Sequence, residues 1–153
     1  MTTIQKRAVT IRTAGRSDLA AVEQLLRDSN LPTVGVEPII GDFLVAEASD
    51  GVVGVVGMEY CCNYGLLRST AVSAAWRGQG VARQLVERII ARAESRGIHA
   101  LYLLTTTAES YFPSFGFTTT TRDAVPAEVQ ATDEFRGACP ASATVMSRVL
   151  RAS

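Results

Sequence analysis

The sequence predicts an α/β (α+β) fold in which a mixed, mostly antiparallel central sheet is flanked by helices. Two observations carry this prediction. Strand patterns in the middle of the chain are separated by the turn sequences Asp50-Gly51 and Asn63-Tyr64-Gly65, which indicate antiparallel hairpins. A strand pattern at Leu66–Val72, a helical pattern from Val81 and a further strand pattern then predict a βαβ crossover, which makes two strands parallel.

The length and composition predict a single domain covering residues 1–153. The chain has 15 Lys plus Arg and 15 Asp plus Glu, which argues against binding to nucleic acid or to a membrane surface. Its apolar runs are far shorter than the ~18 residues of a membrane span. Met1–Arg7 is polar and lacks an apolar signal-peptide core. We therefore expect a soluble cytoplasmic protein.

The first half of the chain is expected to start with a short strand, Val9–Arg12, followed by a helix that Ser17-Asp18 caps. An apolar stripe defines this helix, formed by Leu19, Val22, Leu25 and Leu26. Asn30 and Pro32 end it, and Leu31–Asp42 is expected to be a loop with a short second helix. The two hairpin strands before Leu66 are expected at Phe43–Glu47 and Val52–Tyr60.

The second half is expected to contain one long helix from Val81 to about Ser95, which Gly97 terminates. The elements after it are an apolar strand at Ala100–Thr105, a short helix at Glu109–Phe115, a strand at Phe117–Arg122, turns and short helical pieces at Asp123–Gly137, and a last strand at Ala143–Leu150.

A turn with two glycines joins the strand at Leu66–Val72 to the long helix, in the run Trp76–Arg83. At Gly78 and Gly80 the backbone can approach a ligand closely because no Cβ blocks it. The first amides of the helix lack intrahelical partners and lie at the positive end of its dipole, so the turn could hold a pyrophosphate. It has neither the Lys-Ser/Thr pair of a P-loop nor the Gly-x-Gly-x-x-Gly spacing of a dinucleotide fold. An ordinary turn is the alternative.

The pattern Arg77-x-x-Gly80-x-Ala82 resembles the Arg/Gln-x-x-Gly-x-Gly/Ala motif of the GNAT family of N-acetyltransferases, which bind acetyl-CoA there. Two further stretches resemble this family. Thr70-Ala71-Val72, followed by Ala74-Ala75-Trp76-Arg77, is similar to the strand end before the pyrophosphate loop. Ala108-x-x-Tyr111-Phe112-x-x-x-Gly116-Phe117 is similar to the family's Ala-x-x-Phe-Tyr-x-x-x-Gly-Phe helix. The three stretches and the order of elements together imply the GNAT acyl-CoA N-acyltransferase fold.

A narrower resemblance points to the arsenic-resistance-associated branch of these N-acetyltransferases. Four stretches carry it: Leu66-Leu67-Arg68-Ser69, Leu101–Thr107, Asp123-Ala124-Val125-Pro126 and Cys139-Pro140-Ala141-Ser142. This resemblance suggests a role in resistance without fixing a substrate.

The family resemblance implies acetyl-CoA as co-substrate and no metal. Backbone groups of Thr70, Ala71 and Val72 would bind the pantetheine arm like an added strand. The pyrophosphate would lie on the residues of the glycine turn, namely Arg77, Gly78, Gln79, Gly80, Val81, Ala82 and Arg83. Arg77 and Arg83 would add charge there. The alternatives are a plain core strand and two solvated arginines.

Direct acetyl transfer to an amine needs a base for the amine's proton and an acid for the leaving thiolate. The family often uses a tyrosine as this acid, at the position that Phe112 occupies in this chain. The neighbouring Tyr111 is therefore the candidate acid, with a packed core aromatic as the alternative. Glu59, a carboxylate among apolar strand residues, is the preferred candidate base, and Glu47 is a weaker one.

Arg68 lies in an apolar strand, where a charge without an anionic partner is costly. Strand alternation predicts that it shares a face with Thr70 and Val72. We expect Arg68 to bind a substrate carboxylate or oxyanion, and a structural salt bridge to Glu59 or another acid is the alternative. An anionic small amine, such as an amino acid or its arsenic- or phosphorus-bearing analogue, is thus the expected acceptor.

Three cysteines and one histidine, with no Cys-x-x-Cys, argue against a zinc site. Cys61 and Cys62 are expected to be buried on opposite faces of a strand. Cys139 is expected to be a loop cysteine without a role, with a substrate-side residue or a reactive thiol as the alternative. Two other functions are kept open: a non-catalytic acyl-CoA sensor, and a thiol-based protein that binds arsenicals. An exposed last strand could pair with a second copy, so a homodimer is a further expectation.

Overall fold

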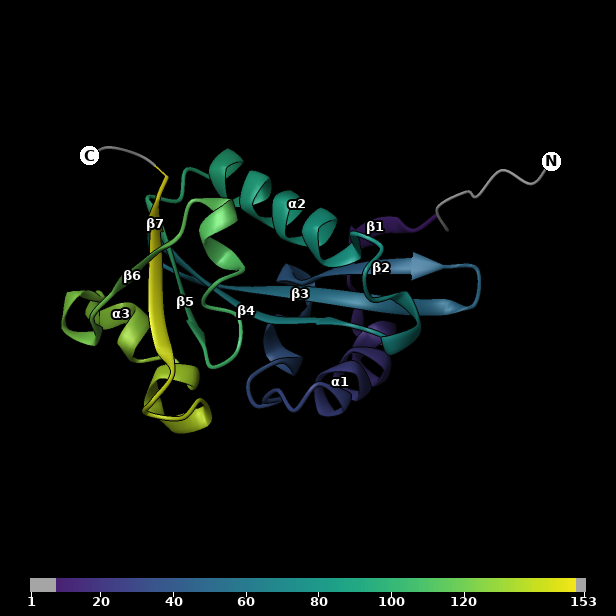
Figure 1. The fold of residues 1–153 in the computed structure, drawn as a ribbon, viewed down its shortest axis with the longest axis horizontal. Helices are drawn as coiled ribbons and strands as arrows, with labels where there is room; N and C mark the ends of the chain where they lie inside the picture. The colour runs from purple at the N-terminus through teal and green to yellow at the C-terminus, as the bar shows by residue number, and fades with distance from the viewer. Residues whose placement is uncertain (1–7, 151–153) are drawn as a thin grey trace.

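The computed structural model describes residues 8–150 and confirms the mixed, mostly antiparallel sheet with helices on both sides. The strand order is β1-β2-β3-β4-β5-β7-β6 across one sheet of the described residues (Figure 1). Only the pair β4 and β5 is parallel, as the crossover through the long helix requires. The predicted Met1–Arg7 segment lies outside the described residues.

The strands are β1 Thr10–Thr13, β2 Leu44–Ala48, β3 Gly51–Cys61, β4 Tyr64–Val72, β5 Ala100–Thr105, β6 Thr118–Thr120 and β7 Thr144–Val149. The α-helices are α1 Leu19–Asp28, α2 Val81–Ser95 and α3 Ala127–Gln130. Short helical turns complete the fold, among them η2 Glu37–Asp42, η4 Phe112–Phe115 and η6 Glu134–Ala138. The predicted bounds of α2 and β5 are therefore correct, and the other strands differ by a few residues at their ends.

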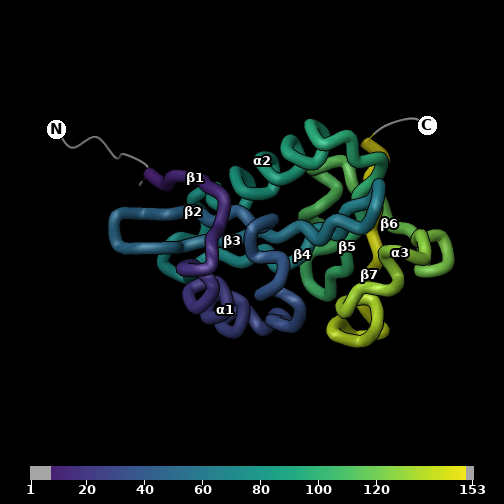
Figure 2. The backbone as a smooth tube through the Cα atoms, turned by 180° about the vertical axis from the view of Figure 1, so that it is seen from behind, coloured from purple at the N-terminus to yellow at the C-terminus, as the bar shows by residue number. Residues whose placement is uncertain are grey.

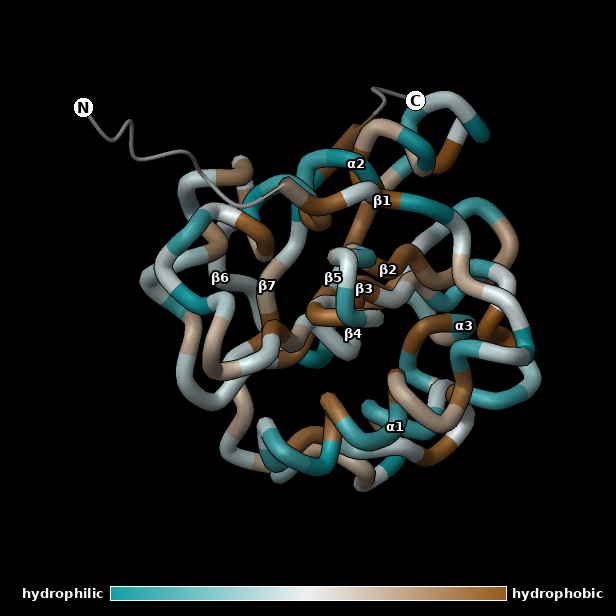
Figure 3. The backbone as a smooth tube through the Cα atoms, turned by 90° about the vertical axis from the view of Figure 1, so that its right-hand side faces the viewer, coloured by the Kyte–Doolittle hydropathy of each residue, from teal (hydrophilic) through white to brown (hydrophobic). Residues whose placement is uncertain are grey.

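Helices α1 and α2 cover opposite faces of the sheet, as the ribbon in Figure 1 and the backbone tube in Figure 2 show. The apolar stripe of α2, including Leu85 and Ile89, packs with alternate residues of β2 such as Leu44 and Ala46. The intervening Val45 belongs to the second core cluster, on the α1 side. Figure 3 shows hydrophobic residues concentrated in the central strands, and both hydrophobic and hydrophilic residues along the helices around them. Period-2 alternation in the strands thus buries both faces of the sheet.

Two local predictions were wrong, and a third was correct only in position. Asp18 is the N-cap residue of α1, but its side chain makes no capping hydrogen bond, because its carboxylate accepts hydrogen bonds from Arg12 and from the Gly15 amide at 2.8 Å. Cys62 is exposed in a turn with φ of 57°, so it does not share a strand with Cys61. The last strand is not exposed at an edge, because β7 pairs with β5 on one side and β6 on the other.

A β-bulge in β4 changes which face Arg68 occupies. Gly57 pairs with Arg68 while Val55 pairs with Ala71, so three steps along β4 match two along β3. The extra residue is accommodated at Ser69, whose φ of 60° is left-handed. Leu67 and Val72 consequently both reach the core on the α2 side. Arg68 therefore does not share a face with Val72, and the prediction from strict alternation was wrong.

The same bulge marks the point from which β4 and β5 separate. Their pairing covers only Tyr64 with Ala100, Gly65 with Leu101 and Leu66 with Tyr102. Residues 67–72 of β4 and 103–105 of β5 continue without pairing to each other. The edge of β4 that faces β5 is thus left open in the middle of the sheet.

None of the helices among residues 8–150 has the length and apolar character of a membrane span.

Candidate functional site

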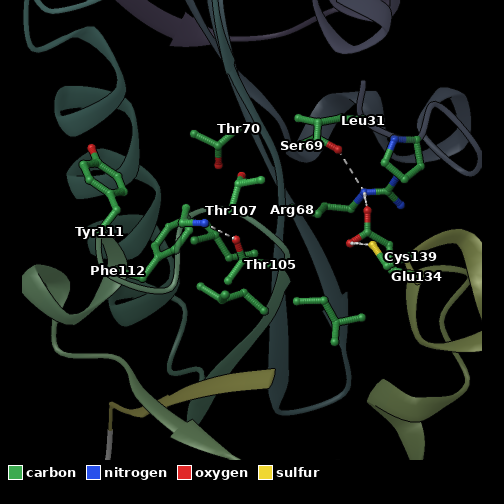
Figure 4. A pocket seen from close by; sticks show the side chains of 15 residues that line it. Leu31, Arg68, Ser69, Thr70, Thr105, Thr107, Tyr111, Phe112, Glu134 and Cys139 are labelled. Atoms are coloured by element: carbon green, nitrogen blue, oxygen red, sulfur yellow. Dashed lines mark hydrogen bonds and ion pairs between the residues drawn. The ribbon is translucent and has the colours of Figure 1, made fainter. Parts of the chain in front are cut away.

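A cavity of about 360 Å³ lies where β4 and β5 separate. Its walls come from both strands, from the loop after α1 and from the segment before β7. Figure 4 shows Arg68, Ser69, Glu134 and Cys139 at one end, Tyr111 and Phe112 at the other, and three threonines between them. The lining is apolar along the strands, at Leu67, Leu103 and Leu104, and polar at these threonines, Thr70, Thr105 and Thr107.

The predicted pantetheine residues lie on the open edge of β4. Thr70 lines the cavity and is partly exposed, whereas Ala71 and Val72 are buried by packing on opposite faces of the sheet. Val72 also lines a second cavity. Both of the proposed descriptions, core strand and binding edge, therefore fit this segment, because its side chains fill the core while one backbone edge faces no strand.

The glycine turn forms the second cavity, also of about 360 Å³, at the start of α2. Gly78 and Gly80 have φ of 78° and 80°, and a Cβ built on either would meet nothing within 4 Å. Gly80 is the N-cap residue of α2, and residues 81–83 of the first helical turn, whose amides have no intrahelical partner, line this space. The donors and the room beside them fit a pyrophosphate. The left-handed φ values explain why glycine is needed at both positions.

The flanking side chains hold this turn in place. Arg77 Nε donates to the Val72 carbonyl at 3.0 Å, and Gln79 Nε2 donates to the Ala75 carbonyl at 3.3 Å. Arg83 donates to Ser114 Oγ at 3.2 Å and lies 4.7 Å from the centre of the Phe115 ring. Arg77 and Arg83 both line the second cavity, so they combine a local structural contact with positive charge at this site.

Tyr111 lines both cavities and therefore lies between them. Its ring packs edge-on against Phe112 and Phe115, with centroids 5.4 and 5.2 Å away. Burial raises the pKa of Tyr111, Arg83 opposes that shift and Glu87 adds to it. The phenol consequently stays protonated at neutral pH. Phe112, at the family's usual tyrosine position, is buried and supplies only an apolar wall.

Arg68 is the charged centre at the far end of the first cavity, and its side chain is 0% exposed. Its Nη1 lies 3.3 Å from Glu59 Oε1, and its Nε lies 3.3 Å from Glu134 Oε2. Nε also donates to Ser69 Oγ at 3.0 Å, and Nη2 donates to the Val34 carbonyl at 2.8 Å. The structure therefore contains the salt bridge to Glu59 that the sequence offered as one alternative. A role of Arg68 in binding substrate stays a prediction.

The two glutamates that pair with Arg68 differ in their access to the cavity. Glu134 is buried and lines it, whereas Glu59 has 25% of its side chain exposed and lines none of the described cavities. Burial raises the pKa of Glu134, while Arg68 and a hydrogen bond from Cys139 lower it and Glu59 raises it. Glu134 was missed in the sequence because it follows a segment without helical or strand periodicity. No local signal in the sequence distinguishes it from a surface glutamate.

The three cysteines, Cys61, Cys62 and Cys139, are all free. Cys139 lines the first cavity, and its thiol donates to Glu134 Oε1 at 3.5 Å. Burial and Glu134 raise the pKa of Cys139 to about 12, and burial raises that of Cys61 to about 11. Neither is a thiolate at neutral pH, which disfavours them as nucleophiles. Residues 8–150 contain no group of three or more His, Cys, Asp or Glu that could hold a metal ion.

Comparisons with known proteins place this geometry among acetyltransferases. A family model described as acetyltransferase (GNAT) domain matches residues 40–119. An amino-acid acetyltransferase of Mycobacterium tuberculosis is 30% identical over 131 residues, which cover 78% of this chain and 74% of the relative. Both matched regions include the second cavity and the open edge of β4.

Solved structures share the fold at lower identity. N-acetylglutamate synthase from Neisseria gonorrhoeae, crystallised with coenzyme A and N-acetyl-glutamate, superposes with a TM-score of 0.80 at 22% identity and covers 97% of this chain. This chain spans only 36% of that synthase. A Mycobacterium tuberculosis protein crystallised with CoA superposes with a TM-score of 0.79 at 24% identity, covering 93% of this chain and 99% of its own.

Proposed function

This chain belongs to the acetyltransferase (GNAT) family, and from that premise we propose that it transfers the acetyl group of acetyl-CoA to the primary amine of an amino acid. The family match supports the reaction, and the amino-acid acetyltransferase relative supports the class of acceptor. We further propose that residues 1–153 act as one N-acetyltransferase domain and that the protein is cytoplasmic.

One observation carries the proposal: the open edge of β4 leads directly into the glycine turn. Residues 70–72 lie on that edge, and the amides that start α2 follow within the same stretch of chain. Tyr111 lines the cavities at both ends of this path. The pantetheine arm of acetyl-CoA fits the edge of β4 as an added strand, and its pyrophosphate fits the turn.

The residues of the site supply most of what acetyl transfer needs. Tyr111 keeps a proton that it can give to the leaving thiolate, since its pKa is raised. The apolar walls at Leu103 and Phe112 exclude water from the thioester. Glu59 remains a candidate base, and it would have to act through water because it does not line the cavity.

We narrow the acceptor to one chemical class, amino acids and their analogues. We propose an amino acid first, because the family relative acts on that class. An arsenic- or phosphorus-bearing amino-acid analogue, and with it a role in arsenical resistance, is a narrower proposal that has only the resemblance of four sequence stretches in its support. In either case the acceptor would occupy the cavity between Arg68 and Tyr111, which lie at its two ends.

The test is release of free thiol from acetyl-CoA in the presence of single acceptors. The panel contains glycine, L-glutamate, L-glutamine, L-arginine, phosphinothricin, spermidine and a lysine peptide. We expect thiol release with one or more of the α-amino acids. Release with spermidine or the peptide alone would contradict the proposed acceptor class. Binding of acetyl-CoA without turnover of any acceptor would favour the sensor function.

A further inference from the structure

The cavity contains one carboxylate that faces the space between β4 and β5, and it is not the one expected from the sequence. Glu134 comes from η6, far along the chain from the strands, and is 4% exposed. Its Oε2 and the Ser69 hydroxyl both contact Arg68 Nε, at 3.3 and 3.0 Å. Arg68 therefore ties Glu134 to the bulge of β4, the point from which the strand edge is open.

We propose that Glu134 binds the amine of the acceptor and takes its proton, and that Arg68 is the positioning residue that holds Glu134 at the open edge. The inference rests on the proposed function, because it assigns a base to the same acetyl transfer. It also specifies the group that this end of the cavity selects, which is a primary ammonium.

The charges at this end of the cavity support an ammonium. One guanidinium, Arg68, is paired with two carboxylates, Glu59 and Glu134, so one negative charge is in excess when both acids are ionised. Arg68 also donates to Ser69 and Val34, so each of its three nitrogens already has a partner, and an acceptor carboxylate would share the guanidinium with two glutamates. A cationic amine balances the cluster, whereas an added anion would compete with carboxylates already in place.

The groups around Glu134 suit a proton acceptor. Arg68 from β4, Glu59 from β3 and the Cys139 thiol from the segment before β7 are the titratable and charged groups that act on it. Burial has the largest effect and raises the pKa of Glu134. A base with a raised pKa takes a proton from an ammonium at a smaller free-energy cost. It must also be ionised to act, so activity requires a pH above this raised pKa.

The proton balance of the reaction is complete with these groups. Glu134 takes one proton from the ammonium, and the nitrogen lone pair attacks the thioester carbonyl. The carbon–sulfur bond breaks, and the leaving thiolate takes a proton from Tyr111. The attacking nitrogen loses its second proton, which passes through water to Tyr111 and restores the phenol. The products are the N-acetyl amine and free thiol, and Glu134 returns its proton to solvent.

The experiment compares Glu134→Gln with Glu59→Gln and with a control, Glu128→Gln, which removes an exposed carboxylate from nearby α3. The probe is L-glutamate, or the amino acid from the panel that the wild type acetylates fastest. For Glu134→Gln we expect kcat/KM at neutral pH to fall about 10²- to 10⁴-fold. Calorimetry should show unchanged acetyl-CoA affinity. The control should retain wild-type activity.

The pH profile separates a base from a structural residue. The wild-type kcat/KM should rise with pH and level off above the raised pKa of Glu134. In Glu134→Gln it should instead keep rising about tenfold per pH unit until the free amine itself is neutral. A profile that is unchanged in Glu134→Gln, or one that changes in Glu59→Gln alone, would overturn the inference.

Two outcomes keep this test independent of folding and of the proposed function. If Glu134→Gln does not fold, Glu134→Asp decides. This variant keeps the carboxylate but withdraws it by one methylene, so the pH profile of kcat/KM should keep its wild-type shape with a lower plateau. An unchanged plateau would overturn the inference. If the wild type neither binds acetyl-CoA nor releases thiol, the proposed function itself has failed. Wild-type turnover with a fully active Glu134→Gln means that only the inference has failed.

Discussion

Replacing Arg68 by methionine tests whether this buried cation holds the end of the cavity together. The change keeps an apolar stem of similar length and removes the guanidinium. It breaks the contacts to Glu59 and Glu134, both at 3.3 Å, and the hydrogen bond to the Val34 carbonyl at 2.8 Å. A buried carboxylate left without its partner is strongly destabilising, so we expect a fall of about 3–5 kcal/mol in the free energy of unfolding.

The pH dependence of this loss follows from Glu134. Without Arg68, the pKa of Glu134 should rise further, because Arg68 is the largest of the effects that lower it. A carboxyl whose folded pKa exceeds its unfolded value destabilises the fold only above the unfolded value, about 4.3 for Glu. The difference between wild type and Arg68→Met should therefore be largest near neutral pH and shrink as the pH falls through the raised pKa.

Urea unfolding and thermal melts at pH 7 and pH 5 measure both effects. At ~2–4 °C per kcal/mol for a chain of this size, the melting temperature at pH 7 should fall by roughly 6–20 °C. The control is Arg16→Met, which breaks an exposed pair with Glu37 at 3.7 Å and should change stability by less than ~1 kcal/mol. A loss below about 1 kcal/mol for Arg68→Met, or one independent of pH, would refute the reasoning.

Three further predictions concern the two cavities and the start of the fold. Gly80→Ala should weaken acetyl-CoA binding in calorimetry and lower the free energy of unfolding by about 1 kcal/mol, because the φ of Gly80 is 80°. The control is Gly97→Ala, which meets the same backbone strain at a φ of 76° and should leave acetyl-CoA binding unchanged. Tyr111→Phe should lower kcat at least tenfold with stability unchanged within ~0.5 kcal/mol, and a kcat equal to wild type would exclude Tyr111 as the acid. Asp18→Asn should lower the free energy of unfolding by about 1–2 kcal/mol above pH 4, because Arg12 lowers the pKa of Asp18. The wild type loses this contribution as the pH falls through that lowered pKa. Acid unfolding curves that coincide for wild type and variant would contradict the prediction.

The sheet and the cofactor path could be predicted because local patterns determine them. Helical spacing located α2 at Val81–Ser95, and an apolar run located β5 at Ala100–Thr105. The glycine turn was recognisable because left-handed positions beside a helix start demand glycine. These features depend on residues close together in the sequence, so the sequence shows them directly.

The bulge and the acidic end of the cavity could not be predicted, because they depend on contacts between distant segments. Strict alternation placed Arg68 with Val72, and the extra residue at Ser69 reverses that relation. Glu134 reaches Arg68 from a segment far along the chain, beyond α2 and β5. Neither feature has a periodic signal, and only the folded arrangement brings the two charges together.

A calorimetric titration of the wild-type protein with acetyl-CoA tests the central claim most directly. The account predicts saturable one-to-one binding, and much weaker binding of S-acetylpantetheine, which lacks the pyrophosphate that the amides at the start of α2 would hold. Equal affinity for the two compounds, or no binding of acetyl-CoA, would contradict the assignment of the glycine turn and of the open edge of β4.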